Sequence, residues 1–90
     1  MSVKNPLEFS TAGVEASESI LLHGKWNFSL WGTWVGTVAV QRRYSADEEF
    51  RTVDEYTANT EKMGEDWEGG EYRIKRTVAT SGTAYARLGQ

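Results

Sequence analysis

The chain has 90 residues, no cysteine and a formal net charge of −3, with acidic and basic residues interspersed. This length corresponds to one domain, and the missing cysteines exclude disulfides and are typical of a protein made in a reducing compartment. The mild charge argues against a nucleic-acid partner, and the lack of a long apolar run argues against a membrane-spanning helix.

The first part of the chain, residues 1–15, is polar and weakly patterned. It has no apolar core of the kind found in a signal peptide, so we expect none. Segments of this composition are often mobile and become ordered only against a neighbour. The sequence therefore predicts a flexible N-terminal arm at 1–15 and a β-domain at 16–90.

The central part of the chain alternates between apolar and polar residues. The segment 18–24 (ESILLHG) predicts a buried strand that ends at Gly24, and the alternation resumes at Trp26. Period two with one apolar face is typical of a half-buried strand, and glycines inside it indicate a bend or a bulge. The apolar series occupies the even positions Trp26, Phe28, Leu30, Trp34, Val38 and Val40, with glycine at 32 and 36.

Three later segments also have strand character. Residues 48–57 (EEFRTVDEYT) favour an irregular strand, 71–79 (EYRIKRTVA) a strand, and 83–89 (TAYARLG) a shorter one. In the second of these, Tyr72, Ile74 and Val78 are expected to share one face. Turns are expected at Gly24, Ser45–Asp47, Met63–Asp66, Gly69–Gly70 and Ser81–Gly82. Turn signals at this spacing predict a small antiparallel β-sandwich or barrel of about six or seven short strands.

The sequence offers little for catalysis. His23 is the only histidine, no serine lies in a G-x-S-x-G motif, and one histidine without cysteine cannot form the usual zinc sites. The acidic segments 45–50 (SADEEF) and 64–71 (GEDWEGGE) do not match a calcium-binding loop and are interpreted as solvated hairpin loops, although calcium remains an alternative. We therefore expect no catalytic residue, no metal and no cofactor, and classify the protein as a non-enzyme.

Tryptophans provide the clearest candidate binding residues. Trp26 and Trp34 share the apolar register and are expected in the core, whereas Trp31 falls on the polar face and Trp67 in an acidic segment. An exposed large aromatic residue often marks an interface. Trp31 therefore either contacts a partner or a sugar, or a bulge at Gly32 turns it into the core.

Basic residues form the second candidate set. Charge alternation places them on solvent faces, where they either contact an acidic surface or an anion, or are merely solvated. The residues concerned are Arg42, Arg43, Arg73, Lys75 and Arg76. From both sets, the predicted interface residues are Trp31, Trp67, Arg42, Arg43 and Arg73.

Residues 24–90 resemble the small β-structured virion proteins of tailed bacteriophages. The similarity lies in GKWNFSLWGTWVGTVAVQRRYS and GGEYRIKRTVATSGTAYARLGQ, and especially in the motif positions Gly32–Arg42, Tyr72–Arg73 and Ser81–Leu88. The resemblance implies a non-enzymatic structural protein of a phage particle. It leaves open whether that protein decorates the capsid or belongs to the neck, the tail or a fibre.

Our leading hypothesis from the sequence is a capsid decoration (cement) protein. In this hypothesis the protein is made in the host cytoplasm, is located in the virion, and is a homo-oligomer that binds the major capsid protein or other virion proteins. Neither nucleic acid nor membrane is an expected partner. The alternative is a carbohydrate-binding β-sandwich module, or a tail or fibre component, that uses Trp31, Trp34 or Trp67.

Overall fold

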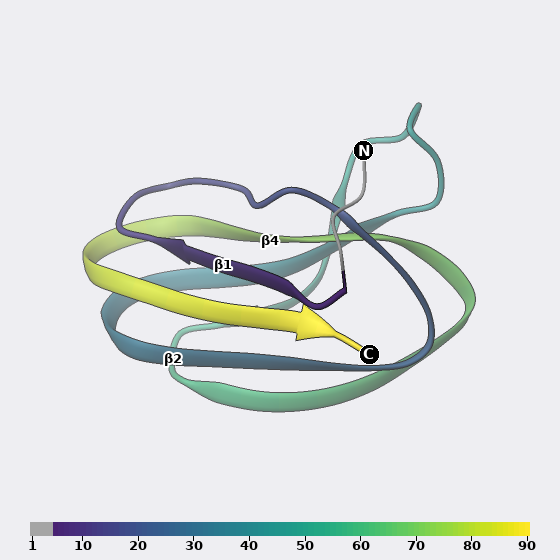
Figure 1. The fold of residues 1–90 in the computed structure, drawn as a ribbon. Coiled ribbons are helices and arrows are strands. Elements are labelled where there is room, and N and C mark those ends of the chain that lie inside the picture. Colours follow the sequence, from purple (N-terminus) through teal and green to yellow (C-terminus); the bar gives the residue numbers. More distant parts are fainter. Residues whose placement is uncertain (1–4) are drawn as a thin grey trace.

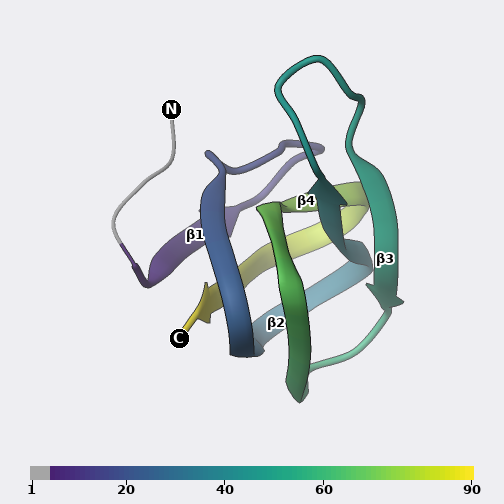
Figure 2. The same ribbon diagram turned by 90° about the vertical axis from the view of Figure 1, so that its right-hand side faces the viewer.

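The computed structural model describes residues 5–90, which form β-strands joined by loops, with no helix in that range. All strands belong to one antiparallel sheet in the order β1-β4-β2-β3, so that β1 and β3 are its edges (Figures 1 and 2). The strands are β1 (Leu7–Thr11), β2 (Ile20–Arg43), β3 (Arg51–Tyr56) and β4 (Thr60–Gly89). The all-β class predicted from the alternating sequence is confirmed.

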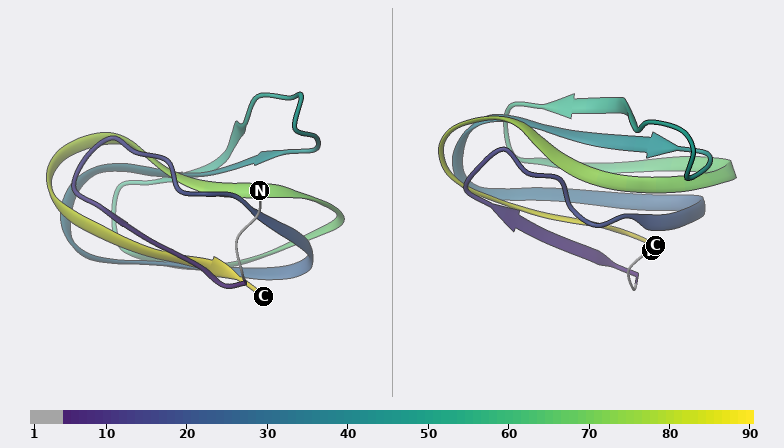
Figure 3. Two further views of the ribbon diagram at one scale, coloured as in Figure 1. Left: turned by 45° about the horizontal axis from the view of Figure 1, so that its top comes forward. Right: turned by 90° about the horizontal axis from the view of Figure 1, so that it is seen from above.

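Two of the strands, β2 and β4, are long and bent. Residues 20–30 of β2 pair with residues 60–72 of β4, and residues 27–43 of β2 pair with residues 71–89 of β4. Near the bend, Ser29 lies between Glu61 on one side and Arg87 on the other. The sheet therefore folds back over itself, with the halves of each long strand in different layers (Figures 1 and 3).

This bending changes the expected strand count. Residues 5–90 contain four strands instead of six or seven short ones. The turns predicted at Gly24, 63–66, 69–70 and 81–82 are wrong, because these residues lie inside β2 or β4. The residues of the turn predicted at 45–47 lie in the connection between β2 and β3. Glycine-rich positions allow a strand to bend or bulge without reversing direction, and register shifts occur along the β2–β4 ladder.

The core lies on the inward face of the folded sheet. The even register of β2 supplies much of it, as predicted, and Trp26 and Trp34 are partly buried and pack against the core. Burial of these side chains is the main favourable contribution to folding. The buried apolar residues include Leu7, Ile20, Leu22, Phe28, Leu30, Val38, Val40, Tyr72, Ile74 and Leu88.

The first strand joins part of the expected N-terminal arm to this core. β1 pairs with the last part of β4, and both Leu7 and Thr11 are buried. After β1 the chain stays attached to β4, because the Ser17 amide donates to the Ile74 carbonyl at 2.7 Å. Residues 7–11 thus belong to the sheet rather than to a separate arm. Residues 1–4 of the predicted arm lie outside the described residues.

The prediction that Arg76 lies on a solvent face with the other basic residues is wrong. Arg76 is fully buried because it continues the inward register of Tyr72 and Ile74. The β2–β4 register then shifts, leaving Thr77 without a partner in β2. Beyond this bulge the face is reversed, so Val78 is exposed and does not share the inward face as expected.

The Arg76 guanidinium is held by backbone carbonyls instead of a carboxylate. It donates two hydrogen bonds from Nη1 and two from Nη2, all between 2.7 and 2.9 Å. It also lies 5.8 Å from the centre of the Trp34 ring. The acceptors, which come from β1, β2 and the bulged part of β4, are Thr11, Val35, Ser81 and Gly82. Arg76 therefore joins three strands where the sheet bends.

Candidate functional site

The most prominent outward feature is a pair of aromatic residues, Trp31 on β2 and Tyr85 on β4. They are direct register partners, their ring centres are 6.1 Å apart, and the ring planes differ by 16°. Trp31 is 44% exposed and Tyr85 is 43% exposed. Of the two interpretations of Trp31, the structure therefore favours the outward one, and the register does not turn this ring into the core.

Gly32 makes room for this pair. Its φ angle of +109° lies in the region that favours glycine. A Cβ at this position would lie 2.9 Å from Cδ2 of Tyr85 and 2.8 Å from the carbonyl oxygen of Thr83. The absence of a side chain thus lets the Tyr85 ring lie against the β2 backbone beside Trp31.

A shallow hollow adjoins the two rings. Its volume is about 210 Å³, and Glu8, Phe9 and Ser10 from β1 complete its lining together with Ala86. The hollow therefore lies beside an edge strand, where backbone groups have no second neighbouring strand. We call Trp31, Tyr85 and this hollow the aromatic face. Its geometry suits contact with an apolar group on another surface.

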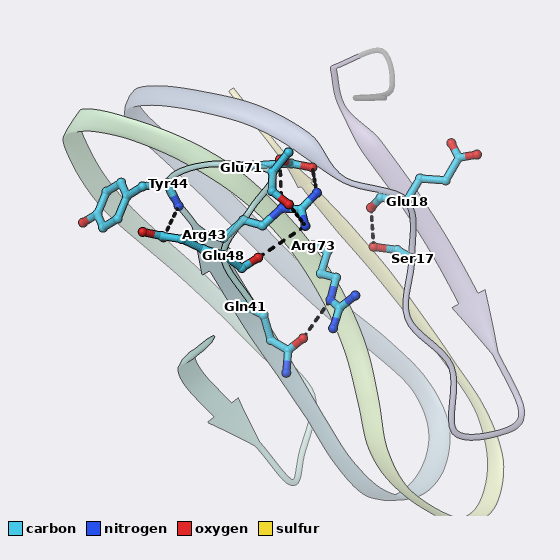
Figure 4. Close-up of polar contacts among 9 residues, drawn as sticks. Ser17, Glu18, Gln41, Arg43, Tyr44, Glu48, Glu71 and Arg73 are labelled. Atoms are coloured by element: carbon cyan, nitrogen blue, oxygen red, sulfur yellow. Dashed lines mark hydrogen bonds and ion pairs between the residues drawn. The ribbon is translucent and has the colours of Figure 1, made fainter. Parts of the chain in front are cut away.

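A second outward feature is a basic cluster around Phe50. The connection between β2 and β3 projects from the sheet (Figures 1 and 3). Phe50 is the last residue of this connection, directly before β3. The Cζ atoms of Arg43 and Arg73 lie 4.4 and 4.1 Å from the centre of the Phe50 ring. Arg43 forms a bidentate ion pair with Glu71, and Nε of Arg73 donates to Oε1 of Gln41 at 2.8 Å (Figure 4).

The pKa directions in this cluster follow from those contacts. The hydrogen bond to Glu71 raises the pKa of Arg43, and the same contact, helped by a hydrogen bond from Ser19, lowers the pKa of Glu71. Burial, and then the charge of Arg43, lower the pKa of Arg73. The first arginine is therefore neutralised by its partner, whereas the second keeps its charge beside a neutral amide.

The remaining predicted residues lie elsewhere. Arg42 points to the opposite face of β2 from Arg43, because successive side chains of a strand alternate. On that face its Nη1 lies 3.4 Å from Oδ2 of Asp66, and its Cζ lies over the Tyr44 ring. Trp67 is 62% exposed and packs over Gly24, with its ring edge-on to His23. Of the five predicted interface residues, the structure brings together only Arg43 and Arg73.

Sequence reasoning missed Tyr85 and Phe50. The alternation in residues 83–89 could have placed Tyr85 outward, but its pairing with Trp31 depends on a register between distant segments. Phe50 lies outside every period-two pattern, and only the folded connection puts it between two arginines.

The described residues offer no group of three or more histidine, cysteine, aspartate or glutamate side chains that could hold a metal ion. His23 is exposed and lies on the surface beside Gly69. Within residues 5–90, no helix has the length and apolar character needed to cross a membrane. No protein-family model matches the chain, and no curated protein sequence matches it.

Proposed function

We propose that this protein is a non-enzymatic structural component of a tailed-phage particle, and specifically a capsid decoration (cement) protein. In this proposal the folded sheet acts as a small barrel-like or sandwich-like scaffold, and the aromatic face docks on the assembled shell. The partner is the major capsid protein, and the protein repeats over the shell as a homo-oligomer. The resemblance of residues 24–90 to phage virion proteins supplies the biological setting.

The observation that carries the proposal is the exposed pair of Trp31 and Tyr85. Tryptophan and tyrosine are enriched among the residues that dominate binding energy at protein interfaces, because each buries a large area with few rotatable bonds. Both rings lie on paired strands, so little conformational freedom remains to be lost on binding. A preformed aromatic surface of this kind favours recognition of a protein partner.

Repetition strengthens such a contact. Closed symmetry presents the same surface many times, and linked weak sites bind much more tightly together than singly. A modest aromatic contact therefore suffices for stable decoration when neighbouring copies also touch. The edge strand β1, which borders the aromatic face, offers backbone groups for contacts between copies.

Binding to particles that lack the protein tests the proposal. Fluorescently labelled wild-type protein, Trp31→Ala and Trp67→Ala are mixed with purified shells, and co-sedimentation gives the fraction bound. Trp67 is an equally large exposed ring outside the aromatic face, so the second variant is a matched control. We expect Trp31→Ala to lose at least tenfold in affinity while Trp67→Ala binds like the wild type.

Three results contradict the proposal. Equal binding by both variants removes the role of the aromatic face, and binding to tails or fibres instead of shells removes the capsid assignment. A shift in tryptophan fluorescence with soluble glycans, lost in Trp31→Ala, with no binding to shells supports the carbohydrate-binding alternative.

A further inference from the structure

Two neighbouring register pairs of β2 and β4 carry different charge arrangements. Arg43 faces Glu71, and Arg73 faces Gln41. The first pair is closed, because Nε and Nη2 of Arg43 each lie 3.0 Å from one carboxylate oxygen of Glu71. At the second pair a neutral amide occupies the position where a glutamate would complete the same ion pair.

The Arg73 guanidinium is oriented but not neutralised. Gln41 accepts from its Nε, and the Phe50 ring supports the plane of the group. Among residues 5–90, no hydrogen bond or ion pair engages its two terminal nitrogens, Nη1 and Nη2. An arginine fork held in this way is preorganised for a planar anion.

An open hollow of about 440 Å³ lies at this group. Lys75, two residues further along β4, lines it together with Arg73, Arg43 and Phe50, and adds a second cation without a described partner. Glu48 and Glu49 form the acidic part of the lining. The lining therefore combines cationic, aromatic and acidic side chains.

We propose that Arg73 and Lys75 form a binding site for a single carboxylate, carried by an aspartate or glutamate side chain of a partner protein. Arg73 supplies two donors to the carboxylate oxygens, Lys75 supplies a third, and the Phe50 ring contacts the methylene part of the incoming side chain. That the partner is a virion protein rests on the function proposed above. The carboxylate site itself does not depend on that function.

The charges around the hollow favour a carboxylate over a phosphate or a polyanion. Arg43 is already paired with Glu71, so its charge is largely used. The two remaining cations share the lining with two glutamates, Glu48 and Glu49. Arg73 and Lys75 attract the single negative charge of a carboxylate, but Glu48 and Glu49 repel any additional negative charge on the ligand. One carboxylate therefore fits this balance better than a dianion.

Titration by nuclear magnetic resonance tests the site. The arginine Nε–H signals of the full chain are followed during addition of the peptide acetyl-Gly-Glu-Gly-amide, with acetyl-Gly-Gln-Gly-amide and inorganic phosphate as parallel probes at constant ionic strength. We expect a saturable shift of the Arg73 signal with the glutamate peptide, a weaker response to phosphate and none to the glutamine peptide.

Three variants make the test specific. Arg73→Gln, followed through the Nε–H signal of the neighbouring Arg43, should weaken binding by roughly tenfold or more, since it removes hydrogen bonds from a charged donor. Lys62→Gln is the matched control, because it makes the same charge change at an exposed position on the first half of β4. Gln41→Glu should stay folded and also lose binding, since its own carboxylate pairs with Arg73.

The possible outcomes separate this site from the proposed function. No response at Arg73, full binding by Gln41→Glu, or tighter binding of phosphate than of the glutamate peptide would overturn the carboxylate site. A response at Arg73 in a protein that does not bind shells leaves the carboxylate site established and removes only the virion partner.

Discussion

Arg76 provides the sharpest test of how the bent sheet is held together. The perturbation is Arg76→Met, which keeps an unbranched side chain in the core but removes every donor. Four backbone carbonyls from β1, β2 and β4 then lose their hydrogen-bond partner. The Nε atom of Arg76 has no partner within residues 5–90, so the four bonds from Nη1 and Nη2 are the hydrogen bonds that the guanidinium makes there.

Two opposing effects set the size of the loss. A hydrogen bond to a charged group contributes about 1.5–3 kcal/mol, and a buried polar group left without a partner costs about 1–3 kcal/mol. Burying a guanidinium without a carboxylate costs several kcal/mol, and this cost disappears in the methionine variant. Four carbonyls without a partner would cost roughly 4–12 kcal/mol together, and the removed desolvation cost offsets part of this, so we expect a net loss of about 3–5 kcal/mol.

Such a loss is large for a domain of this size. Small domains unfold with a free energy of roughly 5–15 kcal/mol, and each kcal/mol shifts Tm by roughly 4–8 °C at this length. Urea and thermal unfolding, followed by circular dichroism, measure the difference. Arg51→Met is the matched control, because Arg51 is exposed on β3 and its side chain makes no hydrogen bond or ion pair within the described part of the chain.

A conservative variant covers the case in which Arg76→Met fails to fold. Arg76→Lys keeps the charge but replaces the planar fork with a single ammonium, so it should be destabilised by an intermediate amount. Amide exchange in β1 should also become faster, since the Thr11 carbonyl loses its contact. A methionine variant within about 1 kcal/mol of the wild type, or a lysine variant as stable as the wild type, would refute this account.

Two further predictions concern the aromatic face and the response to pH. Gly32→Ala should lower stability by about 1–3 kcal/mol through strain at a positive φ and displace the Tyr85 ring, and an unchanged Tyr85 spectrum and unfolding curve would contradict this. Burial raises the pKa of Asp66. Hydrogen bonds, first from Tyr72 (2.5 Å) and then from the Gly69 amide, together with the charge of Arg42, lower the pKa by more than burial raises it, so the net pKa is below the ordinary value of 3.8. The ionised carboxylate therefore stabilises the fold above pH 3.8, and this stabilisation is lost as pH falls through the folded-state pKa. Asp66→Asn should be less stable than the wild type at pH 7, and its unfolding free energy should depend less on pH in acid. Parallel acid profiles of the wild type and Asp66→Asn would show that this carboxylate makes no such contribution.

The sequence was most informative where a single regular strand decides the outcome. Alternation around Phe28 and Leu30, and again at Val38 and Val40, correctly predicted which β2 side chains are buried. The same alternation placed Trp31 outward, because a residue's face depends only on its position when no bulge intervenes.

Prediction failed where bulges or distant pairings decide the structure. A turn was expected at Gly24, but this residue lies inside β2. Val78 was expected on the inward face, but the register shift at Thr77 makes it exposed. A charged residue was placed in solvent by its type, although the strand register directs Arg76 inward. Phe50 reaches Arg73 only through the pairing of separate segments, which local patterns do not encode.

Quantitative mass spectrometry of purified particles from a phage or prophage that carries this sequence tests the central claim most directly. The measured quantity is the number of copies of this protein relative to the major capsid protein. A decoration protein predicts near-stoichiometric abundance. A handful of copies per particle, as expected for a neck, tail or fibre component, or complete absence from the particles, would contradict the capsid assignment.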